Sequence, residues 1–99
     1  MFDKMKALMD MQKKAQEMKR QLESTYFDAA SSDGLVKINM SAAQEVVSVS
    51  ITGDIRSMDK AALERSVREA CLKAIKRSPE IAAQKAREIT GLNLPGLFS

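Results

Sequence analysis

The dipeptide Asp33-Gly34 restricts the fold more than any other feature, because it separates a polar stretch from an alternating apolar run. Gly adopts the positive φ that a tight β-turn requires, so Asp-Gly at this place predicts a hairpin. Val36, Ile38 and Met40 would share one face of the strand that follows. Helical patterns stand on both sides of the hairpin, so the chain is expected to form one α+β domain.

A long N-terminal helix is predicted over residues 2–23, which contain no Pro, Gly or β-branched residue. Its apolar positions have an average spacing of 3.5, the period of helices that pack lengthwise on a partner helix. These positions are Met1, Met5, Leu8, Met11, Ala15, Met18 and Leu22. The partner would be the same helix of a second chain or the C-terminal helical region of this chain.

A three-stranded antiparallel meander is predicted within residues 24–53. Residues 24–30 would form its first strand, residues 35–40 the second and residues 47–52 the third. Val and Ile alternate with Ser and Thr in the third strand, which is typical of a strand with one buried face.

Two helices are predicted within residues 59–90. Pro79 is expected to end the first of them and to begin the second, with Ser78 as its N-cap. The Leu- and Pro-containing tail, residues 91–99, is expected to be extended. The apolar stripe of the first helix consists of Leu63, Val67, Ala70, Cys71, Ala74 and Ile75.

The composition gives little support to catalysis. The chain has no His, the commonest general base, and its four glycines are too scattered to form a phosphate-binding loop. Cys71 lies on an apolar stripe without a His partner, so it is expected to be a small buried residue. We therefore expect no catalytic residue, no cofactor, no metal site and no small-molecule substrate.

The location and assembly of the chain can also be predicted from composition. A single Cys cannot form an internal disulfide and fits a reducing compartment, and the N-terminus lacks the apolar core of a secretion signal. No apolar run approaches the ~18 residues of a membrane span. A cytoplasmic protein without membrane contact is expected. A chain this short buries a limited fraction of its surface, which favours dimerisation.

The basic residues are concentrated at the two ends of the chain. Residues 1–23 carry a net charge of +2 and residues 59–99 one of +3, whereas the residues between them carry −2. Lys6, Lys13 and Arg20 recur every seven residues opposite the apolar seam, with Lys14 beside them. At 1.5 Å per residue this stripe spans ~21 Å, about six phosphate steps along one DNA strand.

A purely solubilising surface is the alternative interpretation of the same stripe. An acidic residue stands three positions before each of its bases, which allows an ion pair along the helix surface. These acids are Asp3, Asp10 and Glu17. Such pairing would partly neutralise the stripe and make polyanion binding modest and salt-sensitive.

The order of these segments resembles the YbaB/EbfC family of bacterial nucleoid-associated proteins. The matching pieces are residues 9–18 (MDMQKKAQEM), 34–38 (GLVKI) and 91–97 (GLNLPGL). The resemblance covers nearly the whole chain, and the order and spacing of the pieces are more specific than any one of them. Two departures are the first strand and the turn at residues 41–43, where family members commonly have Gly.

The resemblance implies a single DNA-binding domain over residues 1–99. It also implies an intertwined α+β homodimer with helical arms built from residues 2–23 and 79–90. Basic residues on the first and last helices would contact DNA with little sequence preference. On this chain those residues are Lys6, Lys13, Lys14, Lys85 and Arg87.

These observations predict a non-enzymatic protein of the bacterial nucleoid, acting as a homodimer on the phosphates of duplex DNA. Single strands are the less favoured ligand, because only four aromatic residues are available for base stacking. The predicted DNA-binding residues are Lys6, Lys13, Lys14, Arg20, Lys85 and Arg87. The alternative function is a protein–protein adaptor that clasps a partner helix through its Met-rich arms.

Overall fold

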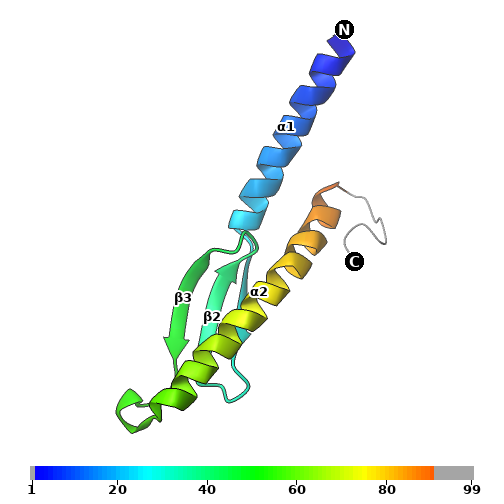
Figure 1. The fold of residues 1–99 in the computed structure, drawn as a ribbon. Helices are drawn as coiled ribbons and strands as arrows, with labels where there is room; N and C mark the ends of the chain where they lie inside the picture. The colour runs from blue at the N-terminus through cyan, green and yellow to red at the C-terminus, as the bar shows by residue number, and fades with distance from the viewer. Residues whose placement is uncertain (1, 91–99) are drawn as a thin grey trace.

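The computed structural model describes residues 2–90 as two long helices and a small sheet (Figure 1). Helix α1 (Phe2–Glu23) leads into the sheet, and helix α2 (Lys60–Thr90) follows it after a short 3-10 helix, η1 (Ile55–Ser57). The molecule is elongated, with extents of 68 × 24 × 17 Å, and α1 projects well beyond the sheet and α2. The predicted α+β class and the predicted first helix are confirmed. The predicted tail, residues 91–99, lies outside the described residues.

The sheet is the predicted antiparallel meander, with strand order β1-β2-β3. Its strands are β1 (Tyr26–Ala30), β2 (Val36–Ser41) and β3 (Val46–Ile51). Gly34 has a φ of +74° in the loop between β1 and β2, which is the conformation that the Asp-Gly pair predicted. The central hairpin is therefore confirmed.

The core lies between α2 and the first two strands. Val36, Ile38 and Met40 are buried on one face of β2, as the alternating pattern predicted. Ala70 and Ala74 of α2 are fully buried against this face. Small side chains at these two positions allow the helix to approach the sheet closely, and Phe27 and Ala29 of β1 complete the core.

The helix break predicted at Ser78-Pro79 is wrong, because α2 runs through Pro79 without interruption. Ser78 was expected to cap a new helix. It is instead buried against the sheet, where its hydroxyl donates to the carbonyl oxygen of Ala42 at 3.2 Å. Ile81, beyond the proline, packs against the same core. Tertiary contacts on both sides of Pro79 therefore offset the ~3 kcal/mol that proline costs inside a helix.

The apolar stripe of α2 is only partly buried. Ala70 and Ala74 face the sheet, whereas Val67 and Ile75 remain 36% and 52% exposed. Cys71 is partly buried and packs at the margin of the core, so it is less buried than expected. The stripe is wider than the surface that one sheet can cover.

Two carboxylates fasten the β1–β2 loop to α2. Asp33 accepts hydrogen bonds from the Ser31 hydroxyl at 2.6 Å, from the Ser66 hydroxyl of α2 and from the Leu35 amide at 3.0 Å. These bonds, with that from Ser31 the most important, lower the pKa of Asp33 to about 2. Glu69 of α2 accepts from the backbone amide and the hydroxyl of Ser32. The loop is thus held by charge-assisted hydrogen bonds.

The lowered pKa of Asp33 predicts an acid-dependent loss of stability. Because the folded pKa lies below the ordinary value of 3.8, the carboxylate stabilises the fold above that pH, and this contribution disappears as the pH falls towards 2. Asp33→Asn should therefore lower the free energy of unfolding at neutral pH. The difference from wild type should shrink between about pH 4 and pH 2 in urea denaturation. A difference that stays constant over this range would contradict the assignment.

The turn between β2 and β3 contains a strained residue. Gln44 has a φ of +65°, the left-handed conformation that costs a residue with a side chain about 1–2 kcal/mol. The Ser41 hydroxyl accepts from the amides of Ala43 and Glu45, both at 3.2 Å, and holds the turn in place. The chain thus has Gln at the one position of this turn where Gly would adopt the backbone conformation without strain.

Replacing Gln44 with Gly should stabilise the protein. The relief of left-handed strain exceeds the 0.5–1 kcal/mol of entropy that Gly costs, so a net gain of about 0.5–1 kcal/mol is expected in urea or thermal unfolding. Ala43→Gly is the matched control, because Ala43 does not have a positive φ. That variant should lose stability, and equal effects of the two substitutions would show that strain at Gln44 is unimportant.

Candidate nucleic-acid interface

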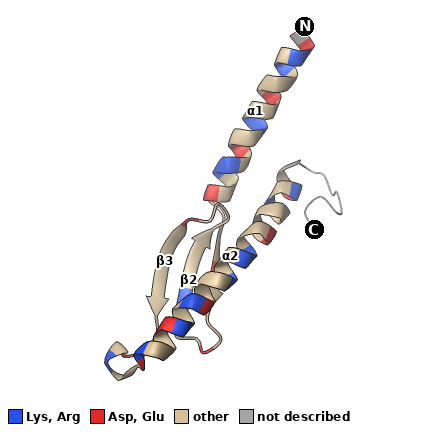
Figure 2. Cartoon of the chain, in the orientation of Figure 1, with Lys and Arg blue, Asp and Glu red and all other residues tan. Residues whose placement is uncertain are grey.

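The predicted basic residues of α1 divide into two groups. Lys6, Lys13 and Lys14 are exposed on the projecting part of the helix, and none of them has an ion-pair partner among the described residues. Arg20 instead pairs with Glu17, and the hydrogen bond from Arg20 lowers the pKa of that carboxyl. Within residues 2–23, only one of the acid–base pairs that the heptad spacing allowed is therefore formed. Figure 2 shows basic residues along the length of α1.

The predicted basic residues near the end of α2 are less accessible. Lys85 pairs with Glu88 at 3.4 Å, and only 30% of its side chain is exposed. It lines a shallow hollow of about 190 Å³ together with Tyr26 of β1 and Ile81 of α2. Arg87 is half-buried and has no ion-pair partner within residues 2–90. Lys85 must be released from Glu88 before it binds an anion and Arg87 is only partly exposed, so the α1 lysines are the better placed group.

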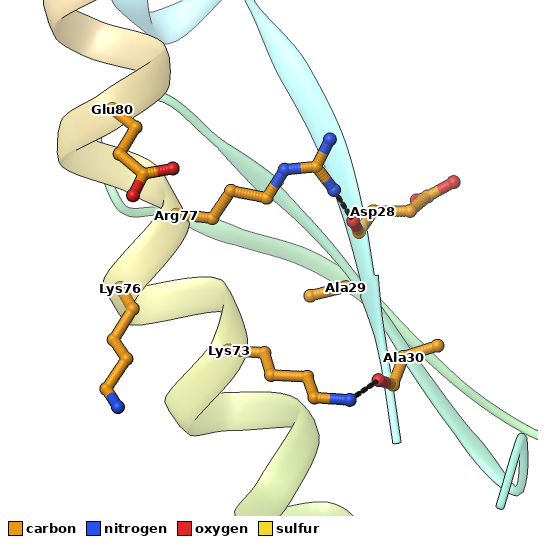
Figure 3. A pocket seen from close by; sticks show the side chains of 7 residues that line it. All are labelled: Asp28, Ala29, Ala30, Lys73, Lys76, Arg77 and Glu80. Carbon is orange, nitrogen blue, oxygen red and sulfur yellow. Dashed lines mark hydrogen bonds between the residues drawn. The ribbon is translucent and has the colours of Figure 1, made fainter. Parts of the chain in front are cut away.

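A basic cluster that sequence reasoning did not single out lies where α2 crosses β1 (Figure 3). Lys73 Nζ donates to the carbonyl oxygen of Ala30 at 3.1 Å, and Arg77 Nη1 donates to that of Asp28 at 2.8 Å. The Arg77 guanidinium also lies 5.8 Å from the centre of the Phe27 ring. The two carbonyl groups belong to an edge strand and could otherwise accept hydrogen bonds from another strand. The cations occupy these acceptors.

A hollow of about 410 Å³ adjoins this cluster and contains a third cation, Lys76. Lys76 points away from β1, unlike its two neighbours (Figure 3). The Asp28 carboxylate accepts from the Asn39 amide at 2.9 Å, so it is directed to the sheet and not to the hollow. The spacing of Lys73 and Arg77, four residues apart on one helix flank, was visible in the sequence. Their contact with β1 required the tertiary structure.

Two kinds of feature are absent from the described residues. No group of three or more Cys, Asp or Glu side chains within residues 2–90 is arranged to hold a metal ion. Neither described helix combines the length and the apolar character needed to cross a membrane.

Comparison with known proteins identifies the family. Residues 1–93 match the sequence profile of the YbaB/EbfC DNA-binding family. The chain belongs to the YbaB/EbfC DNA-binding family. A protein of Synechocystis named nucleoid-associated protein slr1847 is 39% identical over 87% of this chain and 76% of its own length. A nucleoid-associated protein of Dictyoglomus turgidum is 35% identical over 98% of this chain and 96% of its own.

A solved structure supports the fold of this YbaB/EbfC member. The crystal structure of the uncharacterized protein HP0035 from Helicobacter pylori superimposes with a TM-score of 0.73. The match covers 92% of this chain and 98% of the other at 22% sequence identity. At that identity the likeness establishes the shared α+β arrangement of helices and sheet, and the ligand must be argued from the residues of this chain.

Proposed function

We propose that this protein is a non-enzymatic, nucleoid-associated protein of the bacterial cytoplasm that binds duplex DNA as a homodimer. Membership of a DNA-binding family and the names of its relatives support the class of function. The observation that carries the proposal is the group of lysines without ion-pair partners among residues 2–90, Lys6, Lys13 and Lys14, on the projecting helix α1. Long flexible cations without acid partners are suited to phosphate groups.

Modest or absent sequence specificity follows from the type of contact. Phosphate oxygens are the same at every base pair, so lysines that bind them position the protein without reading the sequence. Duplex DNA is favoured over single strands because the α1 surface that carries the lysines offers no aromatic ring for base stacking within residues 3–23. Binding should therefore be governed by charge and by salt.

A homodimer is supported by an apolar surface that the single chain leaves open. Val46, Val49 and Ile51 of β3 are cross-strand neighbours of the buried residues of β2, so they belong to the face on which α2 lies. They remain 43–56% exposed, because α2 does not cover them. Val67 and Ile75 on the adjacent flank of α2 extend the same surface. An exposed apolar surface of this kind is typical of a protein–protein interface.

Sedimentation equilibrium tests the dimer directly. The wild-type chain should sediment at about twice its mass of 10.9 kDa at micromolar concentration. Val49→Asp should shift the mass towards that of the monomer, since a charge in an apolar interface is costly to desolvate. Ser48→Asp is the matched control, because Ser48 lies opposite Asn39 on the other face of the sheet and should leave the dimer intact. A monomeric wild-type chain would reject this assembly.

DNA binding through α1 is tested by removing these three lysines. Lys6→Ala, Lys13→Ala and Lys14→Ala together should leave folding unchanged, because the side chains are exposed and Ala is a good helix former. The slope of log affinity for duplex DNA against log salt should fall by ~0.9 for each lysine that no longer binds a phosphate, or about 2.7 per chain. Lys37, Arg56 and Lys60, exposed elsewhere, provide a control variant with the same change in net charge.

One observation favours a second function, that of a protein–protein adaptor. Met5, Leu8 and Met11 form the exposed seam of α1 and are 62–66% accessible, so α1 could clasp a partner helix. An apolar clasp would be nearly insensitive to salt, whereas phosphate binding weakens steeply. If the triple lysine variant and wild type bind duplex DNA with the same affinity and the same slope, α1 is not the DNA-binding surface. Absence of any duplex binding by wild type would favour the adaptor.

A further inference from the structure

The continuity of α2 through Pro79 aligns three cations that a broken helix would separate. Arg65, Lys76 and Arg87 follow one another at intervals of eleven residues on a single helix. Eleven residues make just over three turns at 3.6 residues per turn, so the three positions drift by only about 20° per step. At 1.5 Å per residue, the line from Arg65 to Arg87 is ~33 Å long. We call these residues the α2 cation line.

The α2 cation line lies on the outer side of the helix. The buried residues Ala70 and Ala74 define the side that faces the sheet. Measured from the midpoint of Ala70 and Ala74 at 100° per residue, positions 65, 76 and 87 are rotated by roughly 120–160°. Arg65 and Lys76 are exposed, and Arg87 is half-buried. Figure 2 shows basic residues along the whole length of α2.

Two of the acidic side chains near this line are engaged elsewhere. Glu69, between Arg65 and Lys76, accepts two hydrogen bonds from Ser32 in the β1–β2 loop, and these lower its pKa. Glu88, next to Arg87, pairs with Lys85. The cations of the line itself form no ion pair within residues 2–90. Their charge is therefore not neutralised by a contact with a carboxylate in this part of the chain.

We propose that the α2 cation line is a second surface for duplex DNA, with the duplex lying parallel to α2. The inference rests on the proposed function and adds Arg65 and Lys76 to its binding residues. One turn of B-DNA is about 34 Å long, which matches the ~33 Å between Arg65 and Arg87. These two residues would contact phosphates of one strand on successive turns, and Lys76 would contact the other strand between them.

The match to a straight double helix distinguishes this surface from a general basic patch. Three cations on a rigid rod, spaced over one DNA turn, can reach phosphates without bending either molecule. Lys73 and Arg77, which lie nearer to β1, are already hydrogen-bonded to strand carbonyls. They are therefore less available than Lys76, although both keep unused donor groups.

The test compares two double variants by titration of a duplex of about two helical turns at several salt concentrations. Arg65→Ala with Lys76→Ala removes two cations of the line. Lys37→Ala with Arg56→Ala removes two exposed cations elsewhere and therefore has the same net charge. The first variant should reduce the log–log salt slope by about 1.8 per chain relative to the control.

Such a change in slope is large enough to measure with two salt concentrations. The factor by which affinity falls between about 50 mM and about 200 mM salt should be roughly tenfold smaller for the Arg65→Ala, Lys76→Ala variant than for the control. Circular dichroism should show the same helix content for both variants, because all four side chains are exposed.

The outcomes separate this inference from the function on which it rests. If wild type binds the duplex and the two double variants have equal slopes and affinities, the α2 cation line is not a DNA surface and the inference is overturned. The contribution of α1 to DNA binding is then still decided by the triple lysine variant. If wild type does not bind duplex DNA at all, the proposed function and the inference fail together. A selective decrease in slope for the Arg65→Ala, Lys76→Ala variant supports the inference.

Discussion

Helix α2 rests on β1 and β2 through Ala70 and Ala74, whose small side chains bring the helix close to the sheet. A helix is about 10 Å wide and strands lie about 4.8 Å apart, so one helix at this distance covers about two strands. Helix α2 does not reach the third strand, β3. Val46, Val49 and Ile51 therefore stay exposed, although they are on the same face of the sheet as α2. The proposed dimer interface is a direct consequence of placing one helix on a three-stranded sheet.

The distribution of charge depends on the same packing. Sixteen basic and thirteen acidic side chains would give only a weakly basic surface if all were exposed and mixed. Several acids are instead hydrogen-bonded within the fold: Asp33 and Glu69 at the β1–β2 loop and Asp28 to Asn39. Each of these hydrogen bonds directs negative charge towards the sheet or its loops. Helices α1 and α2 hold fourteen of the sixteen basic side chains but only eight of the thirteen acidic ones, so they are more positive than the net charge of +3 suggests.

Local patterns in the sequence were sufficient to predict the strands and the first helix. The Asp33-Gly34 turn and the alternation of Val36, Ile38 and Met40 are properties of neighbouring residues, and both are found in the structure. The break expected at Pro79 was wrong because contacts with the sheet, which are remote in sequence, outweighed a local preference. The exposure of Val67 and Ile75 was also missed, since a wide apolar stripe does not reveal how much of it one chain can cover.

The candidate site was predictable to a similar degree. A heptad repeat places Lys6 and Lys13 opposite the apolar seam, and both are exposed. The same repeat allowed three ion pairs, but within residues 2–23 only Glu17 and Arg20 form one, because an exposed pair gains no more than about 1 kcal/mol. The roles of Lys73 and Arg77 at the edge of β1 could not be predicted. They depend on which strand α2 crosses, and no local signal specifies that.

Helix α2 changes its neighbours in the turns that follow Pro79. The hydrogen bond from Ser78 to Ala42 is made just beyond the end of β2, and Ile81 still packs against the core. Beyond this point α2 extends towards α1, and the two helices lie near one another at their C-terminal ends (Figure 1). A break here would let the last turns of α2 move independently of the sheet. Because the helix continues, Arg87 keeps a fixed position relative to Arg65. The orientation of α2 on the sheet therefore determines where both side chains lie on the molecular surface.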